Sequence, residues 1–256
     1  ANEGDDAAIT ERNMLYGQLA REVADAAPKT VYVAGSIGPS NKTLTMADEG
    51  EFEALYHRYC VQIQALHTYV DVLLFETFFD TLNLKAALLA AKTEAPDVPV
   101  MVSVTLEKSG RLLSGQTLEA LVATVEPFSP MSIGLNCSFG AADMLPHLAT
   151  LSSLTSCYVS VHPNAGLPNA LGEYDETPEA MAQAMQPYFE RQLVNIVGGC
   201  CGTTPQHIAL IGQMAAQTAP RIPVQPTQKG YLTGLETLCI DQQFVNVIFD
   251  LYAKYD

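Results

Sequence analysis

Residues 131–161 read MSIGLNCSFGAADMLPHLATLSSLTSCYVSV, and this stretch decides the fold. Its two ends, residues 131–136 and 157–161, are short runs dominated by apolar residues, as in strands that are covered on both faces. Residues 141–151 between them have the apolar spacing of a helix. A strand–helix–strand unit of this length predicts two parallel strands joined by a right-handed crossover.

The same alternation runs along most of the chain. The predicted strands are residues 30–34, 72–76, 98–104, 131–136, 157–161 and 194–197. The predicted helices are residues 9–26, 51–67, 81–92, 117–126, 141–151, 178–189 and 205–216. Thr177-Pro178 and Thr204-Pro205 each resemble an N-cap followed by proline at the first helical position.

This order, one helix followed by six strand–helix units, predicts an α/β fold. We expect a TIM (β/α)8-type barrel that lacks two strands, because a full barrel has eight such units. A doubly wound open sheet is the structural alternative. The repeating pattern stops near Arg221, and the stretch 223–234 that follows contains several Pro and Gly residues.

The composition of the chain argues against some classes of binding partner and of cellular location. The 256 residues contain 13 Lys and Arg against 28 Asp and Glu, a formal net charge of −15, which disfavours nucleic acid and anionic membranes as partners. No apolar run reaches the roughly 20 residues that span a bilayer. The six cysteines are not arranged like a secreted disulfide framework, so we expect a cytoplasmic protein with reduced thiols.

Three of the six cysteines directly follow predicted strands. Cys137 closes the run 134–137, GLNC, and the adjacent pair Cys200 and Cys201 lies in GGCCGT, residues 198–203. Side chains that follow barrel strands face the carboxyl-terminal mouth, so three thiolates can converge there on one soft metal ion. Zinc favours such ligands, and three of them leave a fourth position open. The alternative is that Cys137 is a small core residue and the pair is incidental.

Several motifs resemble the homocysteine S-methyltransferase family. Two carry the resemblance most specifically, GGCCGTTP (198–205) and PNAGLPN (163–169). The others are GLNC (134–137), FETFFDTLN (75–83), SGQT (114–117) and GEY (172–174). The closest branch is the homocysteine-binding module of cobalamin-dependent methionine synthase, and the similarity extends over about residues 9–247.

The resemblance implies a site. Cys137, Cys200 and Cys201 would bind zinc, and the homocysteine sulfur would take the fourth position. Glu76 would bind the substrate ammonium group, although an acid at a strand end can also be simply solvated. Asn164 would lie near the metal, as a substrate-binding residue and the occupant of the open position when substrate is absent, although Asn before a turn is common for local reasons. His162 is more often structural than catalytic at such a position.

The resemblance also implies an organisation. Residues 1–222 would form the barrel domain, and residues 223–256 would be a connector toward a folate-binding module. Methylcobalamin, carried by another module, would then donate the methyl group that converts homocysteine to methionine. The alternatives are a stand-alone enzyme that uses betaine or S-methylmethionine, and a non-catalytic zinc-binding fragment. Because the family's first two strands have no counterpart here, we expect the chain alone to be a poor catalyst.

Overall fold

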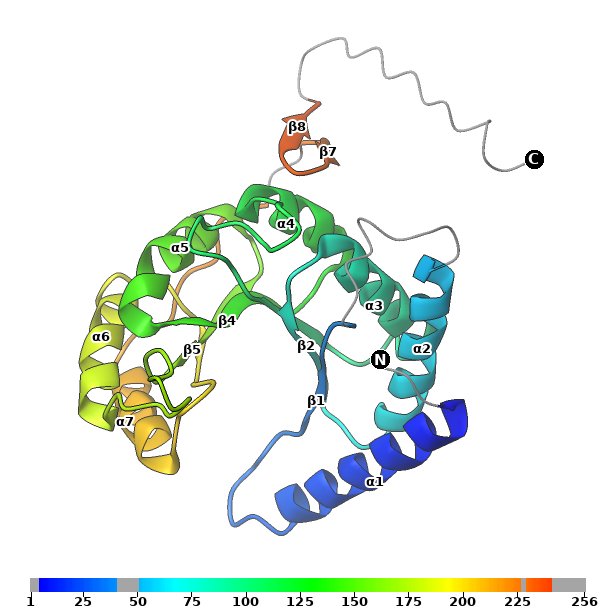
Figure 1. Ribbon diagram of the computed structural model, residues 1–256, viewed down its shortest axis with the longest axis horizontal. Helices are drawn as coiled ribbons and strands as arrows, with labels where there is room; N and C mark the ends of the chain where they lie inside the picture. Colours follow the sequence, from blue (N-terminus) through cyan, green and yellow to red (C-terminus); the bar gives the residue numbers. More distant parts are fainter. Residues whose placement is uncertain (1–4, 41–50, 227–228, 241–256) are drawn as a thin grey trace.

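A six-stranded parallel sheet forms the centre of the computed structural model, which describes residues 5–40, 51–226 and 229–240 (Figure 1). The strands are β1 (Ala34–Ile37), β2 (Val72–Phe78), β3 (Val100–Val104), β4 (Ser132–Gly140), β5 (Tyr158–Asn164) and β6 (Ile196–Val197). They lie in the order β1-β2-β3-β4-β5-β6, and every neighbouring pair is parallel. A doubly wound sheet would reverse its strand order at one point. The sheet therefore has the strand order of a partial TIM barrel, which confirms the predicted fold class.

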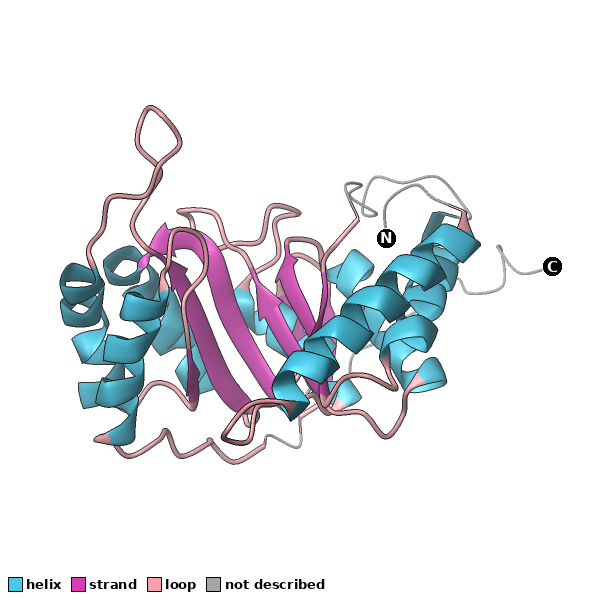
Figure 2. Ribbon diagram, turned by 90° about the horizontal axis from the view of Figure 1, so that it is seen from below, coloured by secondary structure: helices cyan, strands magenta, loops and turns pink. Residues whose placement is uncertain are grey.

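Helices follow the strands and cover the outer face of this curved sheet. They are α1 (Asp6–Asp25), α2 (Glu51–Leu66), α3 (Thr81–Glu94), α4 (Leu118–Val125), α5 (Ala141–Leu154), α6 (Pro178–Glu190) and α7 (Pro205–Ala216), with a 3-10 turn at Glu126–Phe128. Figure 1 shows them as an incomplete ring around the strands, open between α1 and α7. Figure 2 shows the strands side by side, with helices beside and behind them. Within the described residues, β1 and β6 do not pair with each other.

The core lies between the sheet and the helices. Phe75, Val102, Ile133 and Val159 are register partners across four strands, and all four are fully buried. The other face of the same strands carries small and polar residues, among them Ser103, Ser132 and Ser160. Large side chains therefore fill the layer between the sheet and the helices.

All six strands overlap the predicted runs but differ from them at one or both ends. The second, fourth and fifth strands end later than expected, at Phe78, Gly140 and Asn164, and the third begins later, at Val100. The first strand was expected at residues 30–34 but lies at Ala34–Ile37. Tyr32, inside the expected run, is 75% exposed, so its apolar character does not reflect burial in the sheet. The sixth strand was expected at residues 194–197 but is only Ile196–Val197, because only these two residues are paired in register with β5.

Local helix signals were reliable. Both predicted N-caps are confirmed, at Thr177 and Thr204, and the Thr177 hydroxyl accepts from the Ala180 N–H at 3.3 Å. The helix that follows Thr204 has the predicted bounds, Pro205–Ala216. None of the described helices is long and apolar enough to span a bilayer.

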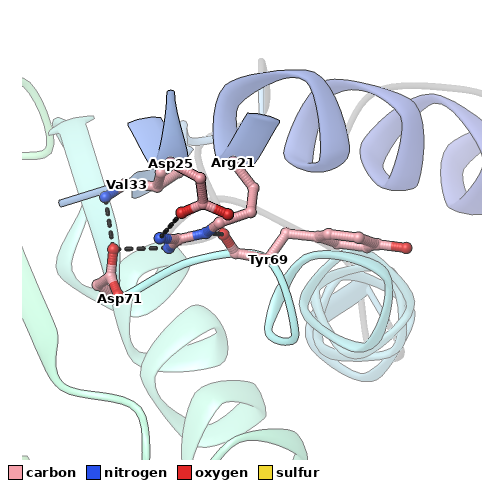
Figure 3. A network of polar contacts seen from close by, with 5 residues as sticks. All are labelled: Arg21, Asp25, Val33, Tyr69 and Asp71. Atoms are coloured by element: carbon pink, nitrogen blue, oxygen red, sulfur yellow. Dashed lines mark hydrogen bonds and ion pairs between the residues drawn. The ribbon is translucent and has the colours of Figure 1, made fainter. Parts of the chain in front are cut away.

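A salt-bridged network fastens α1 to the edge of the sheet (Figure 3). Asp71 Oδ2 accepts from the Val33 N–H at 2.7 Å and pairs with Arg21 Nη2 at 2.6 Å. Arg21 Nε donates to the Tyr69 carbonyl at 3.0 Å. The Val33 N–H, and secondly Arg21, hold the pKa of Asp71 below its usual range. One carboxylate thus ties the entry of β1, the entry of β2 and α1 together.

A small antiparallel hairpin, which the sequence did not predict, follows the barrel. It consists of β7 (Tyr231–Thr233) and β8 (Thr237–Cys239) and lies outside the ring beside α4 (Figure 1). Arg111 Nη2 pairs with Glu236 Oε1 at 2.6 Å, and the Thr117 N–H donates to the Leu235 carbonyl at 3.0 Å. The hairpin thus occupies part of the predicted connector, whereas residues 241–256 lie outside the described residues.

Candidate metal centre

Cys137 lies where β4 leaves regular pairing with β5. The register between the two strands shifts between Asn136 and Gly140, which marks a β-bulge. Cys137 and Ser138 have φ angles of 59° and 58°, in the left-handed region that non-glycine residues rarely adopt. Such a conformation costs about 1–3 kcal/mol and is most common at functional sites. The bulge turns the Cys137 side chain toward the end of the sheet.

Cys200 and Cys201 lie in the loop after β6, and backbone hydrogen bonds hold this loop against the end of β5. The Cys200 N–H donates to the Pro163 carbonyl at 2.8 Å, and the Ala165 N–H donates to the Cys201 carbonyl at 2.9 Å. The Cys201 N–H donates to Asn164 Oδ1 at 3.2 Å. The loop is therefore held in position on both sides of the cysteine pair.

The three thiols converge. Their Sγ atoms all lie within 4.8 Å of one another, with 3.8 Å between Cys137 and Cys201 and 3.9 Å between Cys200 and Cys201. Four sulfurs bound tetrahedrally to zinc at about 2.3 Å are about 3.8 Å apart. The spacing and the soft donor set therefore suit one zinc ion with a fourth position left open. All six cysteines of the chain are free thiols.

Without a metal ion, the surroundings of the cluster disfavour the thiolate form of Cys200. Burial, followed by the neighbouring thiols of Cys137 and Cys201, raises the pKa of Cys200 to about 12. Because a metal ligand must be a thiolate, metal binding at this cluster must displace the Cys200 proton.

Glu76 lies at a second β-bulge, where the register of β2 against β3 shifts between Phe75 and Phe78. Its neighbour Thr77 has a φ of 64°. The Glu76 side chain is half-buried, and its Oε1 accepts a hydrogen bond from the Ser36 hydroxyl on β1. Glu76 therefore lies at the same carboxyl-terminal end of the sheet as the thiols.

Asn136 connects these two strand ends. Its Oδ1 accepts from the Thr77 N–H at 3.0 Å and from the Ser103 hydroxyl at 2.7 Å, and its Nδ2 donates to the Thr77 hydroxyl at 2.7 Å. Glu76 and Cys137 are the immediate neighbours of Thr77 and Asn136. Their relative position is thus set by a buried polar network that the sequence analysis did not identify.

Asn164 and His162 also lie at this end of the sheet. Asn164 is buried, and the bond from Cys201 described above uses its amide oxygen, so Asn164 shapes the cysteine loop directly. Burial lowers the pKa of His162, while the Glu76 carboxylate acts in the opposite direction. A Cβ on Gly198 would lie 2.6 Å from His162 Cδ2, so the imidazole packs closely on the backbone before the cysteine pair.

Tyr174 is a further side chain that the structure brings to the cluster. A Cβ on Gly202 would lie 2.3 Å from Tyr174 Cβ, so Tyr174 packs on the turn directly after Cys201. The only signal in the sequence was its place in the GEY motif, which indicated a family and not a position. Its contacts arise between loops that follow different strands, so spacing along the chain could not reveal them.

Comparison with known proteins shows to which family this chain belongs. A model of the homocysteine S-methyltransferase family matches residues 2–215. The chain belongs to this family. It is therefore a methyltransferase by descent, and the bulges, the thiols and Glu76 all lie within the matched residues.

Solved structures of one Escherichia coli protein are similar to this chain. The apo form of the homocysteine methyltransferase MmuM is 26% identical, with a TM-score of 0.64, and the alignment covers 84% of this chain and 77% of that one. The metallated form is 25% identical, with a TM-score of 0.59 and coverage of 83% and 71%. The oxidized form, at 24% identity and a TM-score of 0.68 with coverage of 82% and 72%, supports the fold.

Proposed function

We propose that this chain transfers a methyl group to the sulfur of homocysteine, with zinc held by Cys137, Cys200 and Cys201. The observation that supports this most strongly is the convergence of three thiols, from two separate strand ends, at distances that suit tetrahedral zinc. The open fourth position is what a substrate thiol requires. The E. coli relative has itself been solved in a metallated form.

The chemistry needs a thiolate, because the thiol of homocysteine is mostly protonated near neutral pH and is then a weak nucleophile. Bound zinc would make the coordinated thiol ionise. The sulfur then attacks the methyl carbon, and the C–S bond forms. The bond from the methyl group to its donor breaks, and its electron pair leaves with the donor.

The residues of the chain bind and orient the substrate. We assign the ammonium group of homocysteine to Glu76, whose carboxylate the Ser36 hydroxyl already orients. Asn164 acts on the site through the Cys201 N–H, and substrate contact remains a prediction for this residue. Asn136 keeps Glu76 and the thiols in register.

For the methyl donor we propose methylcobalamin, presented by another module of a cobalamin-dependent methionine synthase. The motifs at residues 75–83 and 163–169 favour that branch. On this proposal residues 1–222 are the barrel domain, and the segment from residue 223 leads toward a folate-binding module. A stand-alone enzyme that uses betaine or S-methylmethionine is the second candidate, favoured by the similarity to MmuM. A non-catalytic zinc-binding fragment is the third.

The donor assay separates these candidates. Zinc-loaded protein is incubated with homocysteine and, in parallel, with methylcobalamin, betaine or S-methylmethionine, and methionine is measured. Methionine from methylcobalamin alone supports the proposal, and methionine from either of the other donors supports a stand-alone enzyme. Zinc binding without methionine from any donor leaves the non-catalytic reading.

Matched cysteine variants test the metal ligands. Cys201→Ser should lose zinc and activity together. Cys239→Ser, on the hairpin, should retain both, because this half-buried thiol lies outside the cluster. Equal zinc contents in the two variants would reject the assignment. Because all six thiols are free, we also propose a reducing compartment, the cytoplasm, for this chain.

A further inference from the structure

We propose that Ser138 is a positioning residue for the metal site, because its hydroxyl ties the β4 bulge to the end of β3 and thereby aims the Cys137 thiol at the other two. This inference deepens the proposed function and rests on the zinc site proposed there. The GLNC motif ends at Cys137, and the proposed function assigns no role to the residue that follows it.

The bulge in β4 places two residues in a costly backbone conformation. Between the paired residues on either side, residues 137–139 of β4 lie opposite residue 163 of β5 alone. Cys137 and Ser138 cross this bulge with successive left-handed φ angles of 59° and 58°. Neither residue is glycine or asparagine, which adopt this conformation at the lowest cost. Such a backbone persists only where the surrounding structure holds it.

The Ser138 side chain makes contacts that hold the bulge in this conformation. Its Oγ accepts from the Leu106 N–H at 2.8 Å and shares a second hydrogen bond with the Thr105 hydroxyl. Leu106 is buried and Ser138 is half-buried, so these bonds are partly shielded from water. Two bonds to consecutive residues at the end of β3 fix both the position and the orientation of Ser138.

The end of β3 is itself held in place. The first residue after this strand donates its N–H to the Phe78 carbonyl at 2.9 Å. The loop that follows packs on α5, where a Cβ on Gly110 would lie 2.9 Å from His147 Cε1. The His147 ring contacts the ring of Phe139 in the bulge, with centroids 6.0 Å apart. The bulge is therefore fastened on the β3 side by Ser138 and on the α5 side by Phe139.

The position of the Cys137 thiol depends on its two neighbours in the chain. Asn136 holds the residue before it, and Ser138 holds the residue after it. In this arrangement Cys137 Sγ lies 3.8 Å from Cys201 Sγ. A change in either left-handed φ angle would rotate the Cys137 side chain away from the loop after β6. Because zinc binds each sulfur at about 2.3 Å, a displaced sulfur coordinates poorly, so loss of the Ser138 hydroxyl weakens a site that Ser138 does not itself bind.

The test separates the hydroxyl of Ser138 from its backbone conformation. Ser138→Ala removes the hydroxyl and keeps a Cβ on a left-handed residue, whereas Ser138→Gly removes the hydroxyl and relieves that conformation. Ser129 is the matched control, because it is an exposed serine with a φ of 53° that precedes β4, at the opposite end of the strand from Cys137. In the full chain, chelator competition measures zinc affinity, absorption of the Co²⁺-loaded protein reports the geometry of the cluster, and urea midpoints report stability.

Both Ser138 variants should lower zinc affinity about tenfold and shift the Co²⁺ bands, although Ser138→Gly should be more stable than Ser138→Ala. Ser129→Ala and Ser129→Gly should differ in stability in the same direction and keep the zinc affinity and bands of the unaltered protein. A zinc affinity in Ser138→Gly equal to that of the unaltered protein would overturn this inference alone, because the hydroxyl would then have no part in placing Cys137. Equal losses of affinity in the Ser138 and Ser129 variants would also overturn it. An unaltered protein that binds no zinc would overturn the zinc site and this inference together.

Discussion

Asn136 and Thr77 bind each other twice across the ends of β4 and β2: the Thr77 N–H donates to Asn136 Oδ1 at 3.0 Å, and Asn136 Nδ2 donates to the Thr77 hydroxyl at 2.7 Å. The two strands are not neighbours in the sheet, because β3 lies between them. The β-bulges on both strands make this contact, and they place Glu76 and Cys137 at one end of the barrel.

The first prediction concerns Asn136→Ala. The change leaves the Thr77 N–H and the Ser103 hydroxyl without their acceptor, in a buried setting. We expect the free energy of unfolding to fall by about 2–4 kcal/mol. We also expect weaker zinc binding, because the strand end directly before Cys137 loses its side-chain bonds to Thr77 and Ser103. Urea unfolding and chelator competition measure the two effects.

Asn195→Ala is the matched control. The Asn195 side chain makes two hydrogen bonds, one fewer than that of Asn136. It accepts from the Val159 N–H at 3.0 Å and donates to the Arg221 carbonyl at 2.7 Å, at the amino-terminal end of the strands. It should lose comparable stability and keep its zinc affinity. If both variants lose zinc affinity equally, the loss reflects general destabilisation and the role of Asn136 is rejected.

The second prediction concerns the pH dependence of metal binding. The pKa of Cys200, raised to about 12, means that this thiol is protonated in the metal-free protein at neutral pH. Zinc must displace that proton, so affinity should rise steadily from pH 6 to pH 8. Calorimetry in two buffers of different ionisation enthalpy counts the protons released. Binding that releases no proton would contradict thiolate ligation.

The third prediction concerns acid stability. Asp71 has a lowered pKa in the folded protein, so its contribution to stability is present above the unfolded pKa, near 3.8, and is lost as the pH falls through the lower, folded pKa (Figure 3). Asp71→Asn should therefore flatten the fall in urea midpoint below about pH 4. The exposed Asp97→Asn serves as control and should reproduce the original profile. Parallel profiles for all three proteins would show that the Asp71 network contributes nothing to acid stability.

The fourth prediction concerns Arg221, which is only 4% exposed. Its guanidinium donates to the carbonyls of Ser152, Thr155 and Cys157, at distances from 2.5 to 3.1 Å, where α5 ends and β5 begins. Arg221→Met should lower the free energy of unfolding by about 2–4 kcal/mol, because these carbonyls lose their donors. Arg191→Met, at an exposed position, should change it by less than about 0.5 kcal/mol. Equal unfolding midpoints for the two variants would contradict a structural role for Arg221.

Much of the fold was readable from the sequence. Six strands covered by helices appear as short apolar runs, and α7 was bounded correctly because Thr204 and Pro205 act locally. The first strand was misplaced because Val31 and Tyr32 have strand propensity but are exposed. The hairpin was missed because its contacts with Arg111 and Thr117 join segments more than a hundred residues apart.

The sequence predicted which residues form the metal site, but it did not predict how the fold places them. The motifs indicated the three cysteines, and the structure brings their sulfurs together. The left-handed backbone of Cys137 depends on a bulge, and a bulge depends on pairing between strands. The role of Asn136 depends on its side-chain bonds to Thr77 and Ser103, which lie on other strands and far away in the sequence. Such contacts leave no periodic signal in the sequence.

X-ray absorption at the zinc edge tests the central claim most directly, because it counts the sulfur atoms bound to the metal. The zinc-loaded chain should show three sulfurs at about 2.3 Å and one lighter ligand, and addition of homocysteine should raise the count to four. A count that stays at three with saturating homocysteine, or a site with fewer than three sulfurs, would contradict the account.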